Sequence, residues 1–177
     1  MCFTWATSRS AACLDNILPA DFSGTVQCDG YAAYPAYARN REGQGLVLAG
    51  CWAHVRRKFY EAKDSASQQV GWVLLQIGHI YRIEARLRES RAGPRLRQAV
   101  RAAESRPILK RLHQALSRIK LSRRHLPKSA LGRAIDYALS LWLMLEVYGE
   151  DGRVEIDNNT VGNAIRPTAI GRRSDCS

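Results

Sequence analysis

The periodicity of the apolar residues changes once along this chain, near Ser65, and that change limits the folds it can adopt. Before it, short apolar runs alternate with helical patterns. Pro35 lies inside one expected helix, and a glycine-containing turn is expected at 43–45. Strands that alternate with helices predict an α/β sheet with crossover helices. The expected strands are 3–8, 25–28 and 46–51, and the expected helices are 11–19, 31–38 and 54–63.

From Ser65 to about residue 150 the pattern is helical only. Gly93-Pro94 and Pro107 are expected to interrupt the helices of this block, and 123–128 forms a basic loop. One amphipathic helix is expected over 129–148. The chain therefore divides into three parts. They are a partial α/β sheet over 1–64, a helical and arginine-rich block over 65–150, and a closing segment over 151–177.

The positive charge is concentrated in the helical block. Between Arg82 and Arg133 there are 16 Lys or Arg residues and three acids, whereas the whole chain has a net charge of +11. Such a patch favours a nucleic-acid backbone as its partner, through release of counterions. A solvated arginine-rich helical face would have the same composition. Composition leaves both interpretations open.

Five scattered cysteines without a CxxC pair indicate reduced thiols and not a disulfide framework. The first residues lack the basic and apolar regions of a signal peptide. No window approaches eighteen uninterrupted apolar residues, so no membrane span is expected. These features predict a soluble, cytoplasmic protein.

Asp29 follows a predicted strand, at the position where open α/β sheets bind ligands. A carboxylate there could bind Mg²⁺, although Asp-Gly after a strand is also an ordinary turn. Cys51 and His54 have no second pair with which to hold zinc. Three basic residues interleaved with aromatic ones could bind phosphate or form a solvated helix face; they are Arg56, Arg57 and Lys58. The motifs of nucleotide loops, hydrolases and dinucleotide sites are absent.

The segment VEIDNNTVGNAIRPTAIGRR, residues 154–173, places acids and amides ahead of a short helical pattern that ends at Pro167. The acids and amides are Glu155, Asp157, Asn158 and Asn159, and two arginines follow. Carboxylates beside arginines are typical of sites where a metal and a phosphate meet. This segment is therefore the first candidate for an active site.

Three segments resemble the central part of transposases of the insertion sequence 66 family: QCDGYAAY at 27–34, GCWAHVRRKFYEA at 50–62, and the segment 154–173. The stretches at 8–27 and 128–142 fit the same family in order and spacing. The resemblance covers nearly the whole chain. It implies a partial ribonuclease H-like core of the Asp-Asp-Glu type with a large all-α insertion. It also implies two Mg²⁺ or Mn²⁺ ions, transposon-end DNA as the partner, and a bacterial mobile element as the source.

Only part of the family's catalytic triad has a matching residue in this sequence. Asp29 matches the second acid of the triad, with a metal-binding role, and no residue matches the first acid. The Glu of the family lies five residues after the Asp of the DNN motif, and Gly162 stands there. Glu155 and Asp157 are poor substitutes, because Asp157 is rotated off the helical face of residue 162. A lone aspartate cannot hold two metal ions, so we expect a fragment, truncated at both ends, without strand-transfer activity.

Two functions from different classes follow. The chain is either an inactive fragment of a DNA transposase, or a non-catalytic DNA-binding or regulatory module, with self-association left open. A third outcome is a chain that does not fold, since half a sheet exposes unpaired edges. The residues expected to contact DNA are Arg56, Arg57, Lys58, Arg123, Arg124, Arg166, Arg172 and Arg173.

Overall fold

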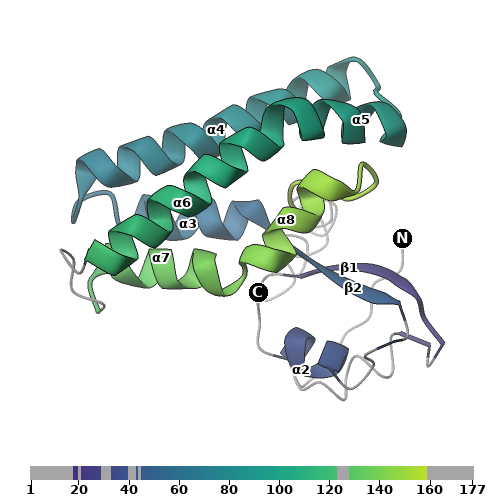
Figure 1. Cartoon of the computed structure of the whole chain (residues 1–177), viewed down its shortest axis with the longest axis horizontal. Helices are drawn as coiled ribbons and strands as arrows, with labels where there is room; N and C mark the ends of the chain where they lie inside the picture. The colour runs from purple at the N-terminus through teal and green to yellow at the C-terminus, as the bar shows by residue number, and fades with distance from the viewer. Residues whose placement is uncertain are drawn as a thin grey trace, which may run out of the picture.

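A computed structural model describes residues 18–19, 21–28, 33–39, 43, 45–122 and 128–158. Two short parallel strands lie beside a group of helices that makes up most of the described chain (Figure 1). Strand β1 (Gly24–Cys28) pairs with β2 (Leu46–Gly50) in parallel, with Cys28 opposite Gly50. Helix α2 (Ala33–Arg39) connects them, as predicted, and Pro35 lies in its first turn, where no helical N–H is required. This arrangement is compatible with an α/β fold.

Helix α3 (Trp52–Glu61) follows β2 after one residue, two residues earlier than the sequence pattern predicts. Its buried residues Trp52, Val55 and Phe59 form one side of the main core. The long helix α4 (Ser67–Glu89) packs against α3 and contributes Val70, Val73, Ile77 and Ile80 to the same core. The apolar period of α4 therefore faces α3, as an amphipathic helix requires.

Pro107 is predicted to interrupt a helix, and the structure has a π-helical turn just before it in place of a break. After the Gly93-Pro94 break, α5 (Pro94–Val100) continues through a π-helical turn η1 (Arg101–Ser105) into α6 (Arg106–Ser122). In this wider turn the N–H of Arg106 bonds to the carbonyl of Arg101, five residues earlier. The π turn removes the usual clash between a proline ring and the carbonyl four residues before it. The helix therefore passes Pro107 without ending.

The prediction of one helix over 129–148 is wrong. Two helices, α7 (Ala130–Ser140) and α8 (Trp142–Glu150), meet at Leu141, whose backbone is not helical. The break lets α7 pack on α3 and α6 while α8 crosses β2. At Gly50 a Cβ atom would come within 2.9 Å of the Leu145 side chain, so glycine permits this close crossing. The T-shaped contact of Trp52 with Trp142 closes the core at the junction.

Among the described residues, no helix is long and apolar enough to cross a membrane. The expected strand 3–8, most of the expected helix 11–19 and residues 159–177 lie outside the described ranges. The sheet has two strands within those ranges. The ribonuclease H-like core remains a prediction from the resemblance.

Candidate functional site

The described part of the closing segment, residues 151–158, runs between the two-stranded sheet and the helices α4, α5 and η1. On the sheet side, the Gln27 side chain donates to the carbonyl of Glu155 at 2.8 Å. The N–H of Trp52 donates to the carbonyl of Ile156 at 3.1 Å, and Cys51 Sγ lies 3.1 Å from Asn158 Oδ1. These bonds place the segment beside the carboxyl end of β2, the edge at which parallel sheets bind ligands.

The side chains of the closing segment alternate between the core and the helical block. Ile156 is fully buried in the core, and Val154 is also buried. The carboxylates of Glu155 and Asp157 instead contact α4 and α5. The two acids of this segment therefore reach the helical block, while the two apolar side chains are buried.

Arg101 holds this segment from the centre of the helical block. Its Nε and Nη2 atoms each donate to an oxygen of Glu84 at 2.8 Å, and both side chains are fully buried. Its Nη1 atom donates to the carbonyls of Tyr148, Asp151 and Val154 at 2.8–3.0 Å. One guanidinium thereby joins α4, the end of α8 and the closing segment. The planar, five-donor fork of arginine suits this combination, which lysine could not reproduce.

Glu84 is kept ionised although it is buried. Burial alone would raise the pKa of its carboxyl, but the hydrogen bonds from Arg101, Tyr148 and Arg97 outweigh burial and lower that pKa. Tyr148 donates to Glu84 at 2.8 Å, and its ring lies 4.3 Å from the Arg101 guanidinium carbon. Burial and the charge of Glu84 raise the pKa of Tyr148, so its hydroxyl remains a donor.

Glu155 extends the network to the edge of the block. Arg97 donates to Glu84 at 3.1 Å and to Glu155 at 2.7 Å, and Arg88 donates to the other oxygen of Glu155 at 2.9 Å. Partial burial opposes ionisation of Glu155, but the two arginines lower its pKa to about 2. We call these five residues the arginine cluster: Glu84, Arg88, Arg97, Arg101 and Glu155.

Acid is expected to weaken the closing segment. The folded pKa values of Glu84 and Glu155 lie below the usual value of 4.5. Their contribution to stability is therefore complete above pH 4.5 and is lost as the pH falls towards 2. Urea unfolding between pH 6 and pH 2 should show this loss, and Glu155→Gln should reduce its pH dependence. Equal pH dependence in the two proteins would contradict the proposed role of Glu155.

Asp157 contacts α4 at a second point. Tyr81 donates to its carboxylate at 2.8 Å, and Asp157 is 5% exposed. Burial, followed by the bond to Asp157, raises the pKa of Tyr81 above its usual range. Asp157 and Glu155 are thus bonded to the helical block. Among the described residues, no group of three or more His, Cys, Asp or Glu side chains is placed to hold a metal ion. The described carboxylates therefore do not fit a two-metal site.

The other residues predicted for the site either lie on the exposed side of α3 or fall outside the described residues. Arg56 is exposed on α3, and Arg57 and Lys58 form exposed ion pairs with Glu61 on the same helix. Asp29 follows the last residue of β1 but lies outside the described residues. The other predicted positions also lie outside them: Gly162, Arg123, Arg124, Arg166, Arg172 and Arg173. Their catalytic and DNA-binding roles stay predictions.

Comparison with known proteins decides the family. Residues 1–175 match the model of the family described as Transposase IS66 family. The chain belongs to the insertion sequence 66 family of transposases. This confirms the resemblance seen in the sequence. No solved structure matches the chain.

Three relatives come from Sinorhizobium fredii (strain NBRC 101917 / NGR234), each described as an uncharacterized protein. The protein y4qI is 36% identical over 179 residues, covering 97% of this chain and 32% of the relative. The protein y4jD is 34% identical over 176 residues, with coverages of 97% and 34%. The protein y4hP is 30% identical over 171 residues, with coverages of 88% and 30%. The chain thus spans about a third of the length of these family members.

Arg97, Arg101 and Glu84 were not among the site residues predicted from the sequence. A signal for Glu84 was present, because it occupies a core-facing position between Ile80 and Leu87. A charged residue at such a position usually needs a buried partner. The partner cannot be identified from the sequence, because Arg101 is only one of many arginines in the insertion.

Proposed function

We propose that this chain is a DNA-binding part of an insertion sequence 66 transposase that does not catalyse strand transfer by itself. The observation that carries the proposal is a division among the arginines of the helical block. Arg88, Arg97 and Arg101 bind acids of the arginine cluster. Several other basic side chains are exposed and have no ion-pair partner within the described residues; they are Arg82, Arg91, Arg95, Arg111 and Arg118.

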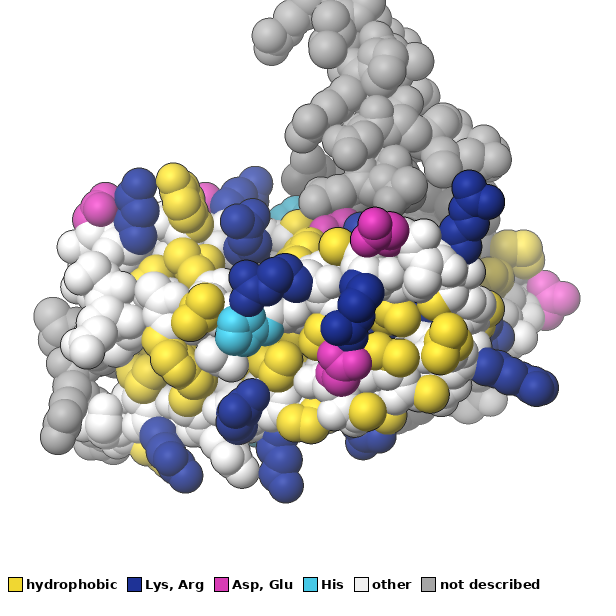
Figure 2. Space-filling view, turned by 90° about the horizontal axis from the view of Figure 1, so that it is seen from above, with side chains coloured by type: hydrophobic (Ala, Val, Ile, Leu, Met, Phe, Trp, Pro, Cys, Tyr) yellow, Lys and Arg dark blue, Asp and Glu magenta, His cyan; other side chains and the backbone are white. Residues whose placement is uncertain are grey.

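These exposed cations suit a phosphate backbone. Figure 2 shows the molecule from above the view of Figure 1, with Lys and Arg side chains distributed among hydrophobic ones over this face. Arg111 and Arg118 lie on α6, two turns apart, and Arg82 lies on the exposed side of α4. A face that contacts only water has no need of so many positive charges. The affinity of a protein for DNA, in contrast, increases with each phosphate that its cations neutralise. The exposed face of α4 and α6 is therefore our proposed DNA interface.

The acids that the family uses for catalysis are incomplete in this chain. By the family resemblance, Gly162 stands at the position of the Glu, which removes one of the three acids. The nearby acids Glu155 and Asp157 are engaged by Arg88, Arg97 and Tyr81, which argues against their replacing the missing ligands. In an intact family enzyme the metal ions would activate the attacking hydroxyl and stabilise the leaving oxygen. A non-catalytic regulatory module that competes for transposon ends remains the second candidate, and the same DNA interface favours it.

Binding to labelled transposon-end DNA should occur without nicking, with Mg²⁺ or with Mn²⁺. The logarithm of the binding constant should fall steeply with the logarithm of the salt concentration. Arg111→Ala combined with Arg118→Ala should reduce the magnitude of that slope by about 2, since each phosphate that the protein no longer neutralises removes roughly 0.9. A gel-shift titration at several salt concentrations measures the slope.

Lys120→Ala combined with Arg153→Ala is the matched control, because it also removes two charges. Both of these residues are already paired, with Asp136 and Asp151 respectively. The control should change the slope less than the α6 variant does. Equal slopes in the two variants would refute the assigned interface. Nicking that disappears in Asp29→Ala would refute the claim of inactivity.

A further inference from the structure

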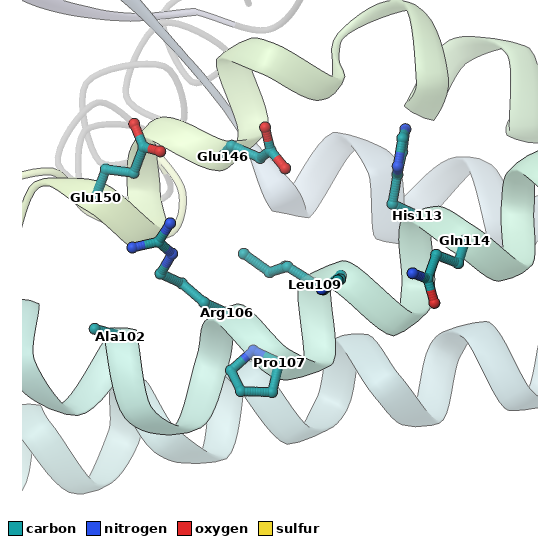
Figure 3. A pocket seen from close by; sticks show the side chains of 9 residues that line it. Ala102, Arg106, Pro107, Leu109, His113, Gln114, Glu146 and Glu150 are labelled. Atoms are coloured by element: carbon teal, nitrogen blue, oxygen red, sulfur yellow. The ribbon is translucent and has the colours of Figure 1, made fainter.

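A groove between α6 and α8 lies outside the closing segment and the arginine cluster. It encloses about 690 Å³ and is lined by residues of η1, α6 and α8. Leu109 forms part of its apolar surface, while Arg106, Glu146 and Glu150 border the same space (Figure 3). The groove therefore has a mixed lining, in which apolar residues lie beside charged ones from both helices.

The two walls carry opposite charges. Arg106 and Lys110 come from α6, and Glu146 and Glu150 come from α8. Within the described part of the chain, neither cation forms an ion pair with either acid. Glu146 instead accepts a hydrogen bond from Trp142 at 2.8 Å. A partner that offers both signs in the reverse order would therefore pair with both walls.

We propose that this face packs against the same face of a second copy of this chain. A two-fold axis parallel to the groove would place α6 of one copy over α8 of the other. The cations of each copy would then face the acids of its partner, and the pairing would occur twice. An isologous interface requires such self-complementarity. A uniform polyanion such as DNA would instead be repelled by Glu146 and Glu150.

An exposed apolar side chain on the same helix supports this choice. Leu143 is 82% exposed and lies about one turn before Glu146, and two before Glu150, on α8. A partner that covers the outer face of α8 would remove Leu143 from water, which favours association. The inference does not depend on DNA binding, because association between copies is measured without DNA.

A charge exchange tests the proposal by sedimentation velocity. The acidic variant carries Arg106→Gln and Lys110→Glu, and the basic variant carries Glu146→Gln and Glu150→Lys. Glutamine at 146 keeps the oxygen that accepts from Trp142. Each variant alone should dimerise at least about tenfold more weakly than the natural chain, because like charges now face each other. An equimolar mixture of the two should form heterodimers again.

Arg95→Glu combined with Arg133→Gln is the control, since it changes the net charge as the acidic variant does but at exposed positions outside the groove. It should leave dimerisation unchanged. Circular dichroism should confirm that each variant is folded, and recovery in the mixture requires folded variants in any case. A natural chain that remains monomeric at high concentration would overturn the proposal. So would a mixture that fails to recover from two folded variants.

Discussion

Replacing Arg101 by Met is expected to lower the free energy of unfolding by about 3–5 kcal/mol, the range for breaking a buried ion pair from one side. Glu84 would remain fully buried, without its bidentate partner. The carbonyls of Tyr148, Asp151 and Val154 would also lose a shared donor. Urea unfolding at pH 7, followed by circular dichroism, measures the loss.

Three variants separate the causes of this effect. Glu84→Met together with Arg101→Met should be more stable than Arg101→Met alone, because no unpaired charge stays buried. Arg101→Lys should not restore the natural stability, because an ammonium cannot reach both carboxylate oxygens and the carbonyls together. Arg86→Met, which breaks the exposed pair with Glu104, should cost only about 0.2–1 kcal/mol. If Arg101→Met and Arg86→Met have equal effects, the arginine cluster does not stabilise the closing segment.

Gly152→Ala is expected to destabilise the protein by about 3 kcal/mol, at the upper end for overpacking. A Cβ atom at this position would collide with the carbonyl oxygen of Pro94 and come within 2.9 Å of the Gln98 nitrogen. Both obstacles belong to the backbone of α5, which cannot move aside as a flexible side chain can. The closing segment would have to move away from α5, and that displacement would strain the bonds from Arg101 and Arg97 as well.

Gly71→Ala provides the matched control. Gly71 lies within α4, and a Cβ atom there would meet nothing within 4 Å. Alanine at an unstrained helical position should stabilise the protein by about 0.4–1 kcal/mol, because the unfolded chain loses freedom. Thermal melts of the two variants should therefore shift in opposite directions. A Gly152→Ala protein as stable as the natural chain would show that the close approach to α5 is not maintained in solution.

The helices of the insertion could be predicted because their apolar periods are long, but their ends and junctions could not. Pro107 is predicted to interrupt a helix because local rules consider only the lost N–H and the clash with the preceding turn. The π turn at Arg101–Ser105 resolves that clash, and Arg101 within it is anchored by Glu84, a residue of another helix. Likewise, nothing local requires a break at Leu141. The break is needed because α7 packs on α3 and α6, whereas α8 crosses β2 at Gly50.

The candidate site, like the fold, could be predicted from the sequence only in part. Sequence alone located the closing segment and recognised the family, because both depend on residue identity and short spacing. The assignment of Gly162 to the Glu position comes from the same resemblance and stays a prediction. Only the tertiary structure determined what Glu155, Asp157 and the arginines contact. Arg88, Arg97 and Arg101 are neighbours of Glu84 and Glu155 in space although up to 67 residues separate them along the chain. Charges at that sequence separation meet only when α4, α5 and the closing segment pack together, so composition could not distinguish the arginines that bind acids from those that are exposed and unpaired.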